Sequence, residues 1–360
     1  MNYLDYIIIA VYLLGFLGIG YFFKENKNSS DYFLGGRSIG WFPLSLSTMA
    51  TQLSAISFIS APAFVGLKEG GGLQWLTYEL AVPLAMAFLL VMIIPTLYKS
   101  GIISVYEFLE KRFDASSRLL IAFVFQISRS VATGVMVYTM ALILQATTGI
   151  EFWISVILIG IITMIYSFQG GMKAVIWGDV IQMCILFFGI VICLGYGLSE
   201  LGGVSNFLTE VDSDRLVAID FTKWGFNNAD GNDEFGFWPM IIGGFFLYAS
   251  YYGTDQTQSQ RLLSSKDMPT IKRLLLANGI FRFPITLTYC FMGLVLGTLL
   301  LQDVGFQNLL DATYQENIGS LAGKKADLMV PIFIIKYLPN GIIGILIVAL
   351  MYAPMSSLSS

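Results

Sequence analysis

Histidine is absent from this chain of 360 residues. Its absence excludes histidine metal sites, Ser-His catalytic triads and histidine proton relays. Charged residues are scarce at 12%, against about 25% in a soluble domain. The three cysteines, Cys184, Cys193 and Cys290, lie in apolar segments and form no spaced framework. With 56% hydrophobic residues and a mean hydropathy of +0.72, the composition predicts a polytopic membrane protein.

Long apolar segments account for most of the chain. A spanning helix needs about 20 apolar residues, and we predict nine such helices. The first has no basic residue ahead of it and no small-residue cleavage site, so it is a retained helix rather than a signal peptide. A short amphipathic segment, 328–338, leads into the ninth. The predicted spans are 4–23, 40–66, 74–98, 119–147, 151–169, 177–199, 237–260, 274–301 and 340–360.

Basic residues are distributed unequally between alternate loops. The odd-numbered loops hold twelve Lys and Arg, with Arg261 counted in the seventh, and the even-numbered loops hold five. The positive-inside rule therefore predicts an N-terminus outside and odd-numbered loops in the cytoplasm. The sequence stops inside its ninth predicted helix without a basic anchor, so we expect the protein to continue beyond residue 360.

Four serines lie at the end of the ninth predicted helix: Ser356, Ser357, Ser359 and Ser360. Residues at i, i+3 and i+4 share one helix face. In hydrocarbon, such hydroxyls must hydrogen-bond a neighbour or coordinate an ion. Neutral hard oxygens together with a carboxylate suit a small cation such as sodium. The alternative is close helix packing through small residues, and the cluster alone does not separate the two.

Two predicted helices are interrupted. The second has Pro43 and Pro62 on either side of a hydroxyl-rich stretch, and the seventh has Gly243-Gly244 followed by the polar segment 249–256. Non-helical backbone at membrane depth is tolerated around a cavity or an ion site. Paired interruptions at corresponding places indicate the binding site of a secondary transporter, with simple structural kinks as the alternative.

Five stretches, in the same order and spacing, resemble the sodium/solute symporter family. Within that family the chain is most similar to bacterial sialic-acid-type transporters and to the iodide/monocarboxylate/vitamin branch. The stretches are Asp31-Tyr-Phe-Leu-Gly-Gly-Arg37, Ala50-Thr-Gln-Leu-Ser54, Ser104-Val-Tyr-Glu-Phe-Leu-Glu-Lys-Arg-Phe113, Gly170-Gly-Met-Lys-Ala-Val-Ile-Trp-Gly-Asp-Val-Ile-Gln182 and Asp255-Gln-Thr-Gln-Ser-Gln-Arg261.

The resemblance implies an all-α polytopic membrane protein with a five-plus-five inverted-repeat transporter fold. Residues 1–39 would hold an extra N-terminal transmembrane helix and a cytoplasmic loop, and 40–199 the first five-helix repeat. Residues 200–236 would form an extracellular loop, and 237–360 the start of a truncated second repeat. The family's C-terminal helices are missing from this chain. It also implies a multi-pass protein of the plasma membrane, here a bacterial inner membrane.

The resemblance further implies two sodium sites. The first lies between the broken second helix and the ninth, and it uses backbone carbonyls freed by the unwound turn together with hydroxyls. The second, present in only some members, adds a carboxylate. Asp179 has an alternative role as the N-cap of the sixth helix, and both roles can coexist. The first set matches Ala50, Leu53, Ala353, Ser356 and Ser357, and the second matches Asp179, Ser356, Ser359 and Ser360.

The solute site is implied by position on the broken second helix. Matching positions are Gln52, Ser54, Ile56 and Ser57. Members that bind neutral sugars carry a Glu-Gln pair at the last two of these positions, and this chain lacks it. Tyr251 matches the inner gate tyrosine of the sugar members, whereas Tyr248 stands where they have an asparagine.

Arg129 lies inside the apolar run of the fourth helix, and a buried guanidinium nearly always has a partner. Its planar fork matches a carboxylate, and sialic-acid-type transporters have an arginine here that binds the substrate carboxylate. The competing interpretation is an internal ion pair with Glu79 of the third helix, and a cavity-lining role is a third. Gln52 replaces a threonine of the sialic-acid type, so sialic acid is one candidate among organic acids.

We therefore predict sodium-coupled import of a small organic solute by alternating access, with an organic anion and two sodium ions favoured. A neutral sugar, polyol or amino acid is the alternative. A transporter-like sensor domain of a signalling protein is an alternative of another class, and a channel is less consistent with broken helices. No enzymatic motif is present. The expected partners are sodium, the solute and the lipid bilayer, with no nucleic acid and no obligatory protein partner inferred.

Overall fold

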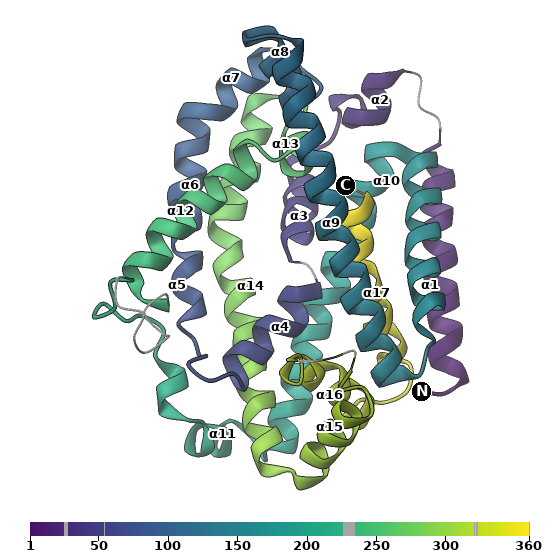
Figure 1. Cartoon of the computed structure of the whole chain (residues 1–360), viewed down its shortest axis with the longest axis vertical. Helices are drawn as coiled ribbons and strands as arrows, with labels where there is room; N and C mark the ends of the chain where they lie inside the picture. Colours follow the sequence, from purple (N-terminus) through teal and green to yellow (C-terminus); the bar gives the residue numbers. More distant parts are fainter. Residues whose placement is uncertain (25–27, 54, 226–234, 320, 322, 360) are drawn as a thin grey trace.

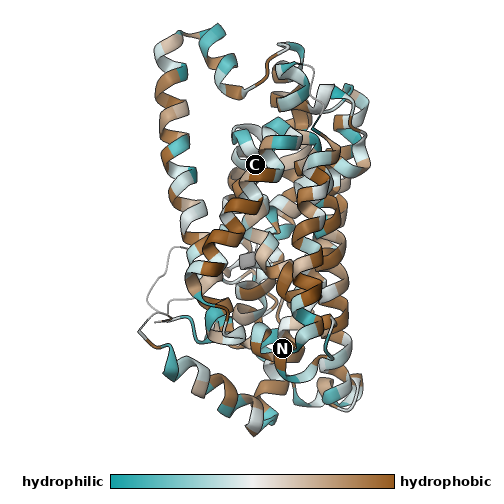
Figure 2. Ribbon diagram, turned by 90° about the vertical axis from the view of Figure 1, so that its right-hand side faces the viewer, coloured by the Kyte–Doolittle hydropathy of each residue, from teal (hydrophilic) through white to brown (hydrophobic). Residues whose placement is uncertain are grey.

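The computed structural model describes all residues except 25–27, 54, 226–234, 320, 322 and 360, and gives the backbone alone at 55 and 56. Over the described residues it consists of helices and connecting segments, with one isolated bridge between Ile39 and Ser265. The helices run side by side in an elongated bundle (Figure 1). Hydrophobic residues predominate along the middle of the bundle and hydrophilic residues gather toward its ends, as expected for a membrane-spanning protein (Figure 2). The predicted all-α fold is confirmed.

The second predicted span is a broken helix, as the sequence indicated. Helix α1 (Tyr3–Phe22) is followed by the short helices α2 (Ser29–Leu34) and η1 (Gly35–Arg37). The second span then consists of α3 (Trp41–Gln52) and α4 (Ala55–Gly66). The axes of α3 and of the segment Ser57–Gly66 differ by 57°.

The hydroxyls of α3 explain why a polar stretch is tolerated here. Ser45, Thr48 and Thr51 each donate to the backbone carbonyl four residues earlier, so they satisfy themselves within the helix. Ser47 instead reaches out to another helix. The stretch therefore consists mostly of locally satisfied hydroxyls, with one that is free to join a site.

The third to sixth spans follow in order. The third span contains a π-helical segment, Leu89–Ile93, between two α-helical segments. The fifth and sixth are joined by a single bent residue, Gly171, where φ is +55° and an added Cβ would lie 2.7 Å from the Tyr32 carbonyl oxygen. These elements are α5 (Trp75–Glu79), α6 (Ala81–Phe88), η2 (Leu89–Ile93), α7 (Ile94–Lys99), α8 (Val105–Arg112), α9 (Ala115–Thr148) and α10 (Phe152–Glu200).

The break of the seventh span lies at Thr254 and Asp255, between α12 (Phe237–Gly253) and α13 (Gln256–Leu263). The break thus lies within the predicted polar segment 249–256, whereas Gly243-Gly244, which were predicted with it, lie inside α12. Gly244 has a packing role instead: a Cβ there would lie 2.9 Å from the Ala81 Cβ. The remaining elements are α11 (Val204–Glu210), η3 (Ser213–Leu216), α14 (Met268–Gln302), α15 (Val304–Glu316), η5 (Ala326–Leu328), α16 (Met329–Tyr337) and α17 (Ile342–Ser359).

Each of the nine predicted spans coincides with helix. Among the described residues, six helices are long and apolar enough to cross a membrane, and the bent pair α3–α4 gives a seventh. Helix α10 contains two predicted spans. Helix α12 has 17 residues, so it is shorter than each of these six helices. The predicted segment 328–338 is α16, and residues 329–334 in it are all buried. The division into two inverted repeats stays a prediction.

Two packed groups position the candidate site. Helix α17 packs against both α10 and α1, while α4 packs along α14. The second contact is made backbone to backbone, because a Cβ on Gly297 would lie 2.4 Å from the Gly66 carbonyl oxygen. Helix α3 contacts both groups, through α10 and α14. The broken helix therefore lies where the two groups meet.

Candidate functional site

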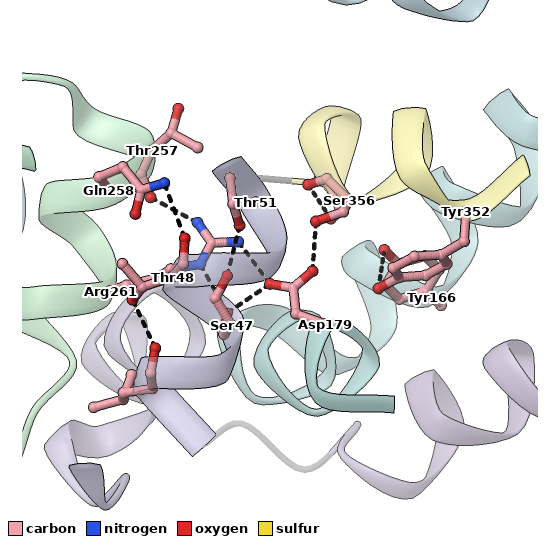
Figure 3. Close-up of polar contacts among 12 residues, drawn as sticks. Ser47, Thr48, Thr51, Tyr166, Asp179, Thr257, Gln258, Arg261, Tyr352 and Ser356 are labelled. Carbon is pink, nitrogen blue, oxygen red and sulfur yellow. Dashed lines mark hydrogen bonds and ion pairs between the residues drawn. The ribbon is translucent and has the colours of Figure 1, made fainter. Parts of the chain in front are cut away.

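A buried ion pair lies at the junction of α3, α10, α13 and α17. Asp179 of α10 and Arg261 of α13 are both fully buried, and Arg261 Nη2 lies 2.7 Å from Asp179 Oδ2. Ser47 Oγ of α3 donates to the same Oδ2 at 2.6 Å, and Ser356 Oγ of α17 donates to Oδ1 at 2.6 Å (Figure 3). One carboxylate thus joins four elements of the chain.

Arg261 also donates to two further groups. Its Nε donates to Ser47 Oγ at 2.8 Å, and its Nη1 donates to the Thr257 carbonyl oxygen at 2.7 Å. A charge with no solvent exposure needs such a shell, because an uncompensated ion in the interior costs several kcal/mol. Arg261 therefore belongs to the buried site, and its assignment to the seventh cytoplasmic loop is wrong. The orientation predicted from the loop charges stays a prediction.

The proposed first sodium set lies along the contact between α3 and α17. Ala50, Ala353 and Ser356 are buried, and Leu53 is the residue at which α3 ends. Ser357 is half-buried and lines a cavity together with Thr51 and Gln52 of α3. The structure thus brings Ser356 and Ser357 of this set close to α3, and the grouping of all five residues around an ion stays a prediction.

The proposed second set is assembled in part. Asp179 and Ser356 are hydrogen-bonded to each other, and Ser359 Oγ donates to the Ser356 carbonyl oxygen at 3.1 Å. Ser360 lies outside the described residues. Asp179 comes eight residues after the Gly171 bend, inside α10, so its alternative role as an N-cap is wrong.

Arg129 has a different partner from the one considered. Its guanidinium forms an ion pair with Asp255, the residue at the break between α12 and α13. The Arg129 side chain is 36% exposed, and the rings of Phe125 and Tyr251 lie 5.5 and 5.7 Å from its guanidinium carbon. The internal pair between Arg129 and Glu79 is therefore wrong. The position beside a break is consistent with a group that a solute can reach.

Glu79 is paired with Arg282 of α14 instead. The two side chains are 1% and 8% exposed, and Arg282 Nη2 lies 3.2 Å from Glu79 Oε1. Tyr248 donates to Glu79 Oε1 at 3.1 Å and accepts from Arg282 at 3.1 Å. Arg282 also donates to Gln52 Oε1, which accepts a second bond from Tyr252 Oη at 2.6 Å. A second buried ion pair therefore lies on the other side of the broken helix.

Two cavities flank Gln52. The first, here called the Arg129 cavity, has a volume of about 280 Å³, and its walls include Gln52, Arg129, Tyr251 and Ser357. The second, here called the aromatic cavity, has a volume of about 520 Å³. Its walls include Gln52, Ser57, Trp75, Tyr78, Glu79, Tyr248, Arg282 and Tyr289. Gln52 and Leu247 line both, so one amide and one leucine side chain lie between them.

The residues predicted for the solute site divide between these cavities. Arg129 and Tyr251 line the first, Ser57 and Glu79 line the second, and Gln52 lines both. Ser54 lies outside the described residues, as does the Ile56 side chain. Sequence reasoning missed Arg261, Arg282 and Ser47 as site residues. The available signal was a basic residue inside or beside a predicted span, which in hydrocarbon requires a partner.

The chain is similar to known proteins of one family. The model of the sodium:solute symporter family matches residues 32–360. The human sodium/iodide cotransporter is 31% identical over 297 residues, covering 81% of this chain and 45% of the relative. The sodium-coupled monocarboxylate transporter 2 of Mus musculus is 32% identical over 297 residues, covering 81% and 46%. The chain spans about half the length of the curated relatives it matches.

A solved structure has the same fold. It is a substrate-bound, outward-open state of a Na+-coupled sialic acid symporter, superposable with a TM-score of 0.85 at 28% identity. The match covers 99% of this chain and 72% of that one. These relatives are transporters rather than enzymes, in agreement with the prediction. The family match over most of the chain, together with this fold, shows that the chain belongs to the sodium:solute symporter family.

Proposed function

We propose that this chain is the site-bearing part of a multi-pass symporter that imports a small organic anion together with sodium. The observation that carries the proposal is the contact between the hydroxyl-rich end of α17 and the broken end of α3, beside a cavity that holds Arg129. An oxygen-rich interface suits sodium, and a guanidinium in the adjoining cavity suits an acid.

At the first site, one sodium ion would bind the carbonyls of Ala50 and Leu53 together with Ala353, Ser356 and Ser357. A second ion would approach Asp179 from its Oδ1 side, which Ser356 shares, because Arg261 and Ser47 hold Oδ2. Arg261 can then keep its partner while sodium is bound. This arrangement supports a sodium role for Asp179 that does not leave Arg261 unpaired.

The solute carboxylate would bind Arg129 by replacing Asp255. That exchange keeps the Arg129 guanidinium paired, and it leaves Asp255, whose side chain is 10% exposed, without its arginine partner. The Arg129 cavity of about 280 Å³ can hold a small organic acid, and Arg129 also lines a second cavity of about 770 Å³. The relatives are named for iodide, monocarboxylates and sialic acid, which are anions or acids, and this supports the same solute class.

A neutral solute is the second candidate, and the aromatic cavity favours it. Glu79 offers an acceptor and Arg282 a donor in a chamber walled by tyrosines and a tryptophan. A sugar, polyol or amino acid could bond both charges and stack on the rings. If the solute is a larger acid, the aromatic cavity would hold the part of the solute that is remote from its carboxylate.

Energetics link the anion to the second sodium. One inward sodium gains about 2.3 kcal/mol per 100 mV of membrane potential. A monoanion that moves with a single sodium is electroneutral and loses this gain, whereas a second sodium restores it. We therefore propose two sodium ions per anion. A sodium Hill coefficient near one that Asp179→Ala leaves unchanged would rule this out.

The decisive experiment is thermal stabilisation of the full-length protein by sodium with a panel of sialic acids, monocarboxylates, neutral sugars and amino acids. An acid should raise Tm only with sodium present, and Arg129→Ala should abolish the shift. Arg118→Ala is the matched control, because Arg118 is also an ion-paired arginine of α9 but lies far along the helix from the cavity. A neutral solute whose shift survives in Arg129→Ala would instead support the second candidate.

A further inference from the structure

Helix α17, which carries the candidate sodium ligands, receives its N-terminal cap from another helix. Asp5 of α1 is fully buried. Its Oδ1 accepts from the backbone N–H of Gly341 at 2.7 Å and of Gly344 at 3.0 Å. The first N–H groups of a helix have no partner within it, so a carboxylate at this place satisfies two of them and complements the helix dipole. The cap spans more than 330 residues of sequence.

The backbones of α1 and α17 touch at this point. A Cβ on Gly344 would lie 2.8 Å from the Asp5 Cα, and Gly341 has a φ of +92° that favours glycine. Asp5 Oδ2 accepts from the Asn2 N–H at 2.9 Å, which fixes the orientation of its carboxylate. The start of α17 therefore cannot slide along α1 without breaking a bond or making a clash.

A second link joins the same helices closer to the site. Tyr12 of α1 donates to Gln182 Oε1 at 3.1 Å, and Gln182 Nε2 of α10 donates to the Ala349 carbonyl oxygen of α17 at 2.8 Å. The link lies next to Pro354, which has no N–H to give the Leu350 carbonyl and so weakens α17 here. Gln182 thus bonds α17 at Ala349, one residue before Leu350, whose carbonyl lacks its usual hydrogen bond within the helix.

We propose that α1 sets the axial position of α17, and with it the sodium affinity, through Asp5 and the Tyr12–Gln182 link. The inference rests on the proposed function. From Gly341 to Ser356 the helix rises about 22 Å, so Asp5 acts on the oxygen cage through the position of α17 and not by contact. A binding constellation has to be held within about 0.5 Å, which makes a rigid anchor effective at that distance. Asp5 and Tyr12 are positioning residues for sodium.

The test uses the full-length protein and compares Asp5→Ala with the unaltered protein. The measured quantity is the sodium concentration for half-maximal Tm shift, determined at saturating solute. We expect it to rise at least fivefold in Asp5→Ala. The apparent solute affinity at saturating sodium should change less than twofold, because neither cavity wall is altered.

Three variants separate position from general stability. Asn2→Ala removes the side chain that caps α1 but keeps the bonds from Asp5 to α17, so it should leave the sodium requirement unchanged. Gly344→Ala keeps the carboxylate but displaces the two helices, so it should raise the requirement as Asp5→Ala does. Tyr12→Phe removes one bond of the second link and should give a smaller rise.

The outcomes are distinct. If the unaltered protein shows no sodium-dependent shift, the proposed function fails. If sodium stabilises the unaltered protein, but Asp5→Ala and Gly344→Ala lower Tm with the same half-maximal sodium concentration, the inference fails and Asp5 is only a structural cap. A rise in Asn2→Ala equal to that in Asp5→Ala would also overturn it, since stability of α1 would then be the cause.

Discussion

Two ion pairs are buried on both sides among the described residues, Asp179–Arg261 and Glu79–Arg282. Each joins one carboxylate to one guanidinium, but their surroundings differ. The first lies between packed helices, and its additional partners are the hydroxyls of Ser47 and Ser356. The second forms part of the wall of a 520 Å³ cavity, and its additional partners are Tyr248 and Gln52. One pair is closed to solutes and the other is open to them.

The difference shows how surroundings decide what a buried pair does. Where both charges are sealed, the pair holds helices together, and an ion can join only by sharing one carboxylate oxygen. Where a cavity adjoins the pair, each charge can exchange its partner for a group on a solute. Breaking the sealed pair should therefore lower mainly the stability of the protein. Breaking the pair at the cavity should lower stability less and solute affinity more.

The largest loss is expected from Asp179→Asn. It leaves the Arg261 guanidinium buried without a counter-charge, which costs about 3–5 kcal/mol of unfolding free energy. Denaturant unfolding of the purified protein measures it. The double variant with Arg261→Gln should recover part of the loss, because no unpaired charge remains. A loss below about 1 kcal/mol in the single variant would mean that water reaches this pair.

A smaller loss of stability and a larger loss of binding are expected from Arg282→Gln. Water in the aromatic cavity can solvate the abandoned Glu79 carboxylate, so we expect about 2 kcal/mol of destabilisation. Solute affinity, measured by the sodium-dependent Tm shift, should fall if the solute extends into this cavity. A stability loss equal to that of Asp179→Asn would contradict the distinction between a sealed and an open pair.

The smallest effect is expected at the half-exposed pair of Asp303 and Lys336, which lie 2.5 Å apart beyond the end of α14. Hydrogen bonds from Lys336 and Tyr337 hold the pKa of Asp303 well below its ordinary 3.8. A depressed folded-state pKa gives stability that is present above the ordinary value and is lost as pH falls through the folded value. Asp303→Asn should cost less than about 1 kcal/mol at neutral pH. It should also flatten the stability curve below pH 4, and an unchanged curve would exclude the pair as its source.

Hydropathy alone was sufficient to predict the apolar helices, because each span must satisfy its backbone internally, but it did not predict the connecting helices α2, α8, α11 and α15. The break of the second helix was also predictable, from Pro43, Pro62 and the hydroxyls between them. The seventh break lies in the predicted polar segment 249–256, where Asp255 caps the next helix, but the accompanying Gly243-Gly244 pair lies inside α12 and does not interrupt it. Glycine in a membrane helix has two uses, close packing and bending, and the sequence does not separate them.

Partner choice was the part that sequence could not supply. Arg129, Arg261 and Arg282 each needed a carboxylate, and Glu79, Asp179 and Asp255 were all available. A pair between Glu79 and Arg129 was the competing interpretation, since both lie at membrane depth, but depth says nothing about which helices are neighbours. Helix packing decided the pairing: α14 lies against α5, and the start of α13 lies near α9.

The buried side chains of α9 lie in its C-terminal third, at Met140, Ala141, Leu142, Ile143 and Leu144. Arg129 holds Asp255 about halfway along the helix. The Arg129–Asp255 pair therefore ties the exposed part of α9 to the break between α12 and α13. Under the proposed function, an acid that takes Arg129 from Asp255 would untie α9 from that break, so solute binding would alter how the fourth and seventh spans are held together.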